Sequence, residues 1–279
     1  ALAEPRLVVE RSQESPRQHH VGDRLVGHVA HEQIDVVSGV GVTGGVKKTY
    51  SYRADVKRFL PMGTDGRHVV NRAHTIQLPD TGNANNTPKA MGASLVVVYR
   101  DPSTTASLNA VVIYDGLYTL NNATRGMTQV MKGFYDPAAG STGKLTHIVG
   151  GASTGKSELL IAPGVNELNA FRGYGPGEGW DNVTRTTDPI SPADSLTTSV
   201  NPPGFGAHDC LVWSAIVYST KVNDSDSDGL LDKWESSAGT LYDPLGNALP
   251  NLWSMGANPL HKDLFIEIGY MQTGATTYG

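Results

Sequence analysis

The sequence predicts a mainly β protein whose larger part folds as an antiparallel β-sandwich. Glycine (32) and proline (16) are frequent among the 279 residues, which favours many turns and short strands over long helices. Short runs of β-branched residues recur along the chain, and turn-forming residues bound each of them. We expect the sandwich to occupy residues 1–220. Within this range, the secondary structure of residues 1–90 is poorly defined by the sequence pattern.

The expected elements follow one another along the chain between these turn residues. Residues 34–46 (IDVVSGVGVTGGV) indicate a strand and a turn, and residues 48–60 indicate a strand that ends in one or two helical turns. Stronger strand signals lie in six later runs, at 93–101, 109–116, 128–136, 144–150, 157–164 and 210–220.

Three stretches between these runs lack a regular pattern. Residues 171–182 are a glycine-rich loop, and residues 79–92 and 188–209 are long and irregular. Long irregular stretches pack poorly by themselves, so 79–92 and 188–209 are candidate contacts between subunits.

Composition restricts the possible partners. The net charge is −5 and no basic stretch occurs, which argues against nucleic acid. No apolar run reaches 18 residues, so we expect no membrane span, and the single cysteine, Cys210, allows no intrachain disulfide. The first residues, ALAEPRL, fit either a mature end left by signal cleavage or an arbitrary start.

Residues 150–157 (GGASTGKS) match two catalytic patterns, the phosphate-binding loop G-x-x-x-x-G-K-[ST] and the serine-hydrolase elbow G-x-S-x-G. Both need a helix directly after the loop, whereas Pro163 ends any helix that starts at Ser157 within about five residues. We therefore interpret the string as turn residues of a hairpin between 144–150 and 157–162, and expect no enzyme.

Residues 224–235 (DSDSDGLLDKWE) match the calcium-loop pattern D-x-[DN]-x-[DN]-G-x5-E at every constrained position. Alternate aspartates on a turning loop point their carboxylates inward together, and Gly229 stands where the chain must turn with a positive φ. The pattern predicts a Ca2+ site with these ligands: Asp224, Asp226, Asp228, the carbonyl of Leu230, Asp232 (directly or through water) and Glu235.

The flanks of the loop favour a structural ion over a signalling switch. An acidic linker is the competing interpretation, but a linker need not place Gly229, the apolar Leu231 and Glu235 in register. A regulatory EF-hand has a helix before its loop, whereas a strand-like run leads into this one. We expect residues 221–279 to form a small EF-hand-like calcium-loop module that ends in a strand at 263–270 (DLFIEIGY).

Residues 208–235 (HDCLVWSAIVYSTKVNDSDSDGLLDKWE) and 255–271 (MGANPLHKDLFIEIGYM) resemble part of secreted bacterial multidomain proteins. In these proteins a β-rich N-terminal region leads into one calcium loop and often into a metalloprotease-like domain. The loop also resembles thrombospondin type 3 repeats and dockerins. The resemblance implies the same calcium ligands. It does not extend to protease chemistry, because the sequence has no H-E-x-x-H, and Gly269 stands where the family commonly has an acidic residue.

These features predict an exported or cell-surface, calcium-stabilised module without catalytic activity, which associates with other proteins or with itself. Two alternatives remain. The chain could be the non-catalytic N-terminal portion of a secreted zinc metalloprotease. It could instead be a carbohydrate-binding module that stacks polysaccharide on loop aromatics, for which the candidates are Tyr174, Trp180 and Phe205.

Overall fold

The structure is a computed structural model that describes residues 51–76, 91–99, 107–120, 126–154, 157–173, 179–202 and 210–266. It also gives the backbone of four short strands: β1 (Pro5–Glu10), β2 (Leu25–His28), β12 (Met271–Thr273) and β13 (Thr276–Tyr278). Three short helices are described: the 3-10 helices η1 (Lys57–Phe59) and η2 (Trp253–Met255), and the α-helix α1 (Asp232–Ser236).

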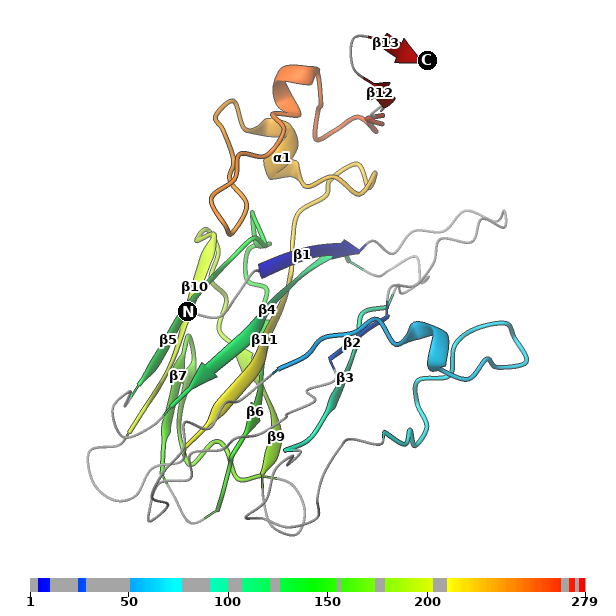
Figure 1. Cartoon of the computed structure of the whole chain (residues 1–279). Coiled ribbons are helices and arrows are strands. Elements are labelled where there is room, and N and C mark those ends of the chain that lie inside the picture. Colours follow the sequence, from blue (N-terminus) through cyan, green and yellow to red (C-terminus); the bar gives the residue numbers. More distant parts are fainter. Residues whose placement is uncertain are drawn as a thin grey trace.

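Two antiparallel sheets pack against each other as a sandwich, which confirms the prediction of a mainly β protein built as an antiparallel sandwich (Figure 1). The five-stranded sheet has the order β1, β4 (Asn109–Thr119), β11 (Val212–Lys221), β6 (Gly143–Gly150) and β9 (Trp180–Thr187). The four-stranded sheet has the order β5 (Met127–Lys132), β10 (Ser195–Asn201), β7 (Leu159–Ala162) and β8 (Val165–Leu168).

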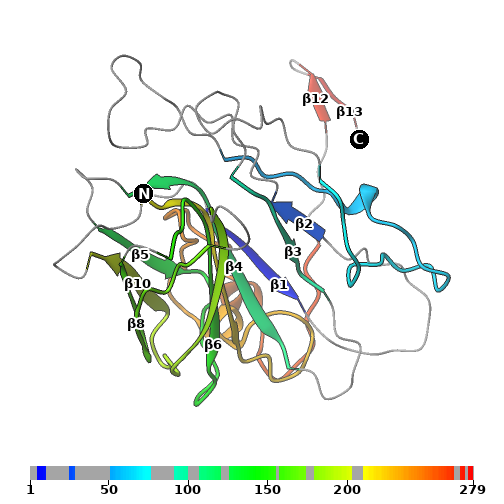
Figure 2. The same ribbon diagram turned by 90° about the horizontal axis from the view of Figure 1, so that it is seen from below.

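The remaining strands form small ribbons outside the sandwich. β3 (Ser94–Val97) pairs with β2, and β12 pairs with β13. Figure 2 shows the β2–β3 ribbon and the segment with η1 on one side of the sandwich. All six runs with strong strand signals contain a strand, and η1 supplies the helical turn expected at the end of 48–60.

The prediction that residues 188–209 are irregular is wrong for the middle of this range. Residues 195–201 form β10, which pairs with β5 on one side and β7 on the other. Its inward positions are Leu196, Thr198 and Val200, all buried. Because the polar Thr198 takes the central inward position, the sequence lacks the alternation of apolar and polar residues that would predict this strand. The other stretch, 79–92, lies almost wholly outside the described residues.

The glycine-rich loop predicted at 171–182 is also shorter than expected, because β9 begins at Trp180. The hairpin predicted at 144–162 is wrong, since β6 belongs to one sheet and β7 to the other. The GGASTGKS segment therefore crosses between the sheets, and a strand, not a helix, follows it. At Gly151 φ is +76°, and a Cβ there would lie 2.5 Å from the Cys210 carbonyl oxygen. Gly155 and Lys156 lie outside the described residues.

Aromatic rings fill the space between the sheets. Trp213 and Tyr218 of β11 are fully buried. Trp213 meets Tyr118 edge-on at 6.1 Å and Phe171 at 6.0 Å between ring centroids. Burial of such rings supplies much of the hydrophobic stabilisation that holds a sandwich together.

A buried histidine connects the two sheets through hydrogen bonds. The Trp213 Nε1–H of β11 donates to His147 Nδ1 of β6 at 3.0 Å. An indole N–H only donates, so the imidazole proton sits on Nε2 and is donated to Thr198 Oγ1 of β10 at 3.1 Å. Thr198 donates in turn to the Ile161 carbonyl at 3.4 Å. Complete burial lowers the pKa of His147 to about 3, which keeps the ring neutral.

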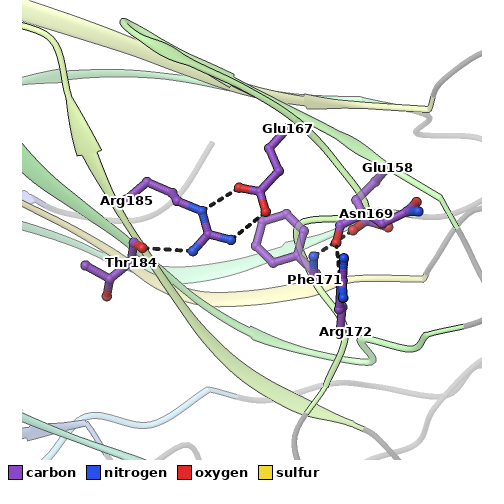
Figure 3. Close-up of polar contacts among 7 residues, drawn as sticks. All are labelled: Glu158, Glu167, Asn169, Phe171, Arg172, Thr184 and Arg185. Atoms are coloured by element: carbon purple, nitrogen blue, oxygen red, sulfur yellow. Dashed lines mark hydrogen bonds and ion pairs between the residues drawn. The ribbon is translucent and has the colours of Figure 1, made fainter.

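An ion pair connects the sheets at one side of the sandwich. β8 and β9 are the terminal strands of their sheets there, and Arg185 of β9 binds both carboxylate oxygens of Glu167 of β8 (Figure 3). This pair holds the pKa of the Glu167 carboxyl below its usual range. Nearby, the buried Glu158 accepts the Phe171 backbone N–H at 2.8 Å, also drawn in Figure 3. None of the helices in the described residues is long and apolar enough to cross a membrane.

Candidate metal centre

The predicted calcium loop is anchored at both ends on the sandwich. At its entry, Asn223 Nδ2 donates to Asp136 Oδ2 at 3.0 Å. At its exit, Leu231 is fully buried in the core cluster, and Trp234 meets Tyr135 edge-on at 5.9 Å. Both ends of the loop are therefore fixed by the body of the protein.

The backbone between these anchors turns as the pattern predicts. Gly229 has φ +98°, in the region that only glycine adopts at little cost, and Ser227 has φ +66°. The Asp224 carboxylate accepts the backbone N–H groups of Asp228 and Gly229, each at 3.2 Å. Asp226 Oδ1 accepts the Asp228 N–H at 3.1 Å. These bonds curl the loop around its own carboxylates.

Within the part of the chain that the structure describes, two groups of acidic side chains are close enough to share a metal ion. In each group, one potential ligand atom per residue lies within 4.8 Å of the others. The first group is Asp224, Asp226 and Asp228, and the second is Asp228, Glu235 and Asp263. Because Asp228 belongs to both, the five carboxylates form one continuous cluster, which contains four of the predicted ligands.

Glu235 is the most informative member of the cluster. It is 0% exposed, and neither carboxylate oxygen has a hydrogen-bond partner among the described residues. Burial, and to a smaller extent the nearby carboxylates of Asp228, Asp226, Asp263 and Asp232, together raise the pKa of Glu235 to about 8. A buried carboxylate beside other carboxylates is costly unless a cation compensates it. Five oxygen donors fit a hard divalent cation such as Ca2+.

The other two predicted ligands are Asp232 and the Leu230 carbonyl. Asp232 belongs to neither group, because its Oδ1 accepts the Ser225 N–H at 2.7 Å and its Oδ2 accepts the Ser225 hydroxyl at 2.6 Å. Asp232 thus closes the loop across its base. The Leu230 N–H donates to Asp228 Oδ1 at 2.7 Å, and ligation by the Leu230 carbonyl stays a prediction.

Asp263 is the member that sequence reasoning missed. Its backbone N–H donates to Asp228 Oδ2 at 2.7 Å, and its own Oδ2 accepts the Asn258 N–H at 2.8 Å. No spacing rule connects this residue to the loop, because it reaches the cluster through the fold. Asp263–Ile266 form no strand, contrary to the strand predicted at 263–270. Residues 267–270 lie outside the described residues.

Trp180, a candidate for stacking on sugar, is engaged within the protein. Its Nε1–H donates to Ser94 Oγ at 2.8 Å, and Ser94 Oγ donates to Asn182 Oδ1 at 2.6 Å. The indole lies so close to Gly92 that a Cβ there would clash with it. The ring therefore attaches the β2–β3 ribbon to β9. The other two aromatic candidates lie outside the described residues: Tyr174 and Phe205.

Comparisons with known proteins add little to this description. No family model matches the chain, and no curated protein matches it. One solved structure, described as "Structure of infectious bursal disease virus Gx strain", is similar with 14% identity and a TM-score of 0.27. The similarity covers 82% of this chain and 59% of that chain. A TM-score of this size carries no argument about fold or function.

Proposed function

We propose that this chain is an exported, non-catalytic module that a bound Ca2+ ion stabilises and that associates with other proteins or with copies of itself. The observation that carries the calcium site is Glu235, a fully buried carboxylate beside Asp228 and Asp263 whose oxygens lack hydrogen-bond partners among the described residues. A divalent cation would supply the missing partner and offset the repulsion among the carboxylates.

Calcium fits this donor set better than magnesium. Ca2+ accepts six to eight oxygen ligands in a flexible arrangement, whereas Mg2+ prefers few protein ligands and keeps several waters. Extracellular calcium modules bind with dissociation constants of roughly 10⁻⁴ to 10⁻³ M. Export therefore predicts an affinity in this range for the single loop, which calcium titration measures.

Exposed apolar side chains support association with other proteins. Leu260, Leu264 and Ile266, which follow the loop, are 80%, 84% and 76% exposed. Large exposed apolar residues close together are typical of interaction sites. The non-catalytic assignment is supported by the GGASTGKS segment, which leads into β7 where both catalytic patterns require a helix.

Calcium titration of the metal-stripped protein tests the proposal. Isothermal titration calorimetry should show saturable binding of CaCl2 and weaker binding of MgCl2. Free Ca2+ at a hundred times its dissociation constant should add about 2.7 kcal/mol to the free energy of unfolding. Thermal melting with and without EGTA gives an independent measurement.

Glu235→Gln separates a metal site from an acidic cluster. Without calcium the variant should melt higher than the wild type, because glutamine replaces a buried carboxyl group that must either keep its charge or take up a proton on folding. With calcium it should lose the stabilisation. Glu167→Gln, at the edge of the sandwich, is the matched control and should keep the stabilisation by calcium. Asp226→Asn gives a second test within the loop. A flat titration together with identical melting in EGTA and in calcium would rule out the proposed ion.

A further inference from the structure

The segment that carries Asp263 is weakly attached to the rest of the protein. Residues 258–266 contain no strand or helix, and most of their side chains are exposed. Ala257, just before the segment, is the last buried residue among those described. The segment therefore buries too little apolar surface to fix its own position.

Two of its described contacts lead back to the calcium loop. The Asp263 N–H donates to Asp228 Oδ2 at 2.7 Å, and Lys262 Nζ donates to the Ser227 carbonyl at 3.2 Å. In addition, the Asp263 carboxylate lies within ligand distance of Asp228 and Glu235. Without a cation, the carboxylates of Asp228 and Asp263 repel each other, and the exposed segment gains little from lying beside Glu235. With a cation, the same carboxylates attract it.

We propose that Asp263 is a ligand of the calcium ion and that the ion latches residues 258–266 onto the loop. This inference rests on the proposed function, because it assigns a further ligand and a conformational consequence to the same site. The second observation behind it is again the buried, unpartnered carboxylate of Glu235, which lies between the loop and the segment. Calcium then controls whether Leu260, Leu264 and Ile266 are held in a defined arrangement.

Hydrogen exchange tests the latch in the wild-type chain. Amide exchange in residues 258–266 should slow about tenfold or more when calcium is added, together with exchange at Gly229 and Leu230 in the loop. Protection of the loop amides without any change in 258–266 would overturn the latch and leave the metal site standing. Absence of calcium binding would overturn both.

The variant Asp263→Asn tests whether Asp263 binds the ion or only stabilises its turn. Asparagine keeps the side-chain oxygen that accepts the Asn258 N–H, but it removes the charge. We expect the variant to bind calcium about tenfold more weakly or worse, since affinity follows the number of charged ligands. We also expect it to lose the calcium-dependent protection of 258–266, while Gly229 and Leu230 still respond to saturating calcium.

Asp243→Asn is the matched control. Asp243 also accepts turn N–H groups, from Leu245 and Asn247, and lies in the same part of the chain outside the acidic cluster. Its substitution should leave both calcium affinity and the protection of 258–266 unchanged. Equal calcium affinity in wild type and Asp263→Asn would mean that Asp263 serves the turn alone, and the inference would be wrong.

Discussion

The buried His147 should make the sandwich acid-sensitive at a pH where most carboxylates are still ionised. Both of its ring nitrogens are engaged, Nδ1 as acceptor from Trp213 and Nε2 as donor to Thr198. Protonation must therefore break the bond from the indole and place a charge between the two sheets. The folded protein resists this, and the pKa of His147 falls from 6.5 to about 3.

The sign and size of the effect follow from proton linkage. Between about pH 3 and pH 6.5 the unfolded chain binds a proton that the folded chain does not bind, so stability falls as the pH is lowered. Above about pH 7.5 the contribution is fully present. At pH 5, which is about 1.5 units below the unfolded pKa, the loss is about 2 kcal/mol at 1.36 kcal/mol per unit.

Urea denaturation of the wild type and of His147→Gln at pH 7.5 and pH 5 measures this loss. Glutamine cannot take up the proton, so its stability should fall by about 2 kcal/mol less than that of the wild type over this range. NMR titration gives a second measurement if the glutamine variant is too unstable. A His147 imidazole that titrates near pH 6.5 in the native protein would refute the reasoning.

Two further perturbations test other parts of the fold. In urea denaturation, Gly133→Ala should destabilise the protein by about 1–3 kcal/mol more than Gly140→Ala. Both glycines have a positive φ, so the backbone cost of a Cβ applies to both. A Cβ at residue 133 would in addition lie 2.6 Å from Pro244, whereas a Cβ at residue 140 would meet open space. Equal losses would mean that the Pro244 contact contributes nothing. Arg185→Met should cost less than about 1 kcal/mol, and the cost should shrink at high salt, since both partners of the Glu167 pair are about one-third exposed. A larger, salt-independent loss in a double-mutant cycle would contradict this.

The parts of the fold that the sequence predicted are those where apolar and β-branched residues are dense. β4 and β11 are rich in such residues, and both are interior strands of their sheet. β10 was missed because Thr198 takes an inward position, where it bonds to His147. A buried polar network of this kind has no sequence period, since its partners come from different strands.

The candidate site was likewise predicted from the sequence only in part. The loop could be predicted because its carboxylates follow one another at fixed spacing on a turn that Gly229 permits. Asp263 could not, because it reaches Asp228 through the tertiary fold. Asp232 matched the pattern, yet its carboxylate bonds to Ser225, and no local rule separates a ligand from a residue that closes the loop.

β11 runs directly into the calcium loop and is paired along its length with β4 on one side and β6 on the other (Figure 1). A pulling force applied beyond the loop would act along this strand and load its two hydrogen-bond ladders in shear, so that many bonds must break together. Tension on the C-terminal region would thus be borne by the middle of the five-stranded sheet, a geometry suited to a mechanical tether.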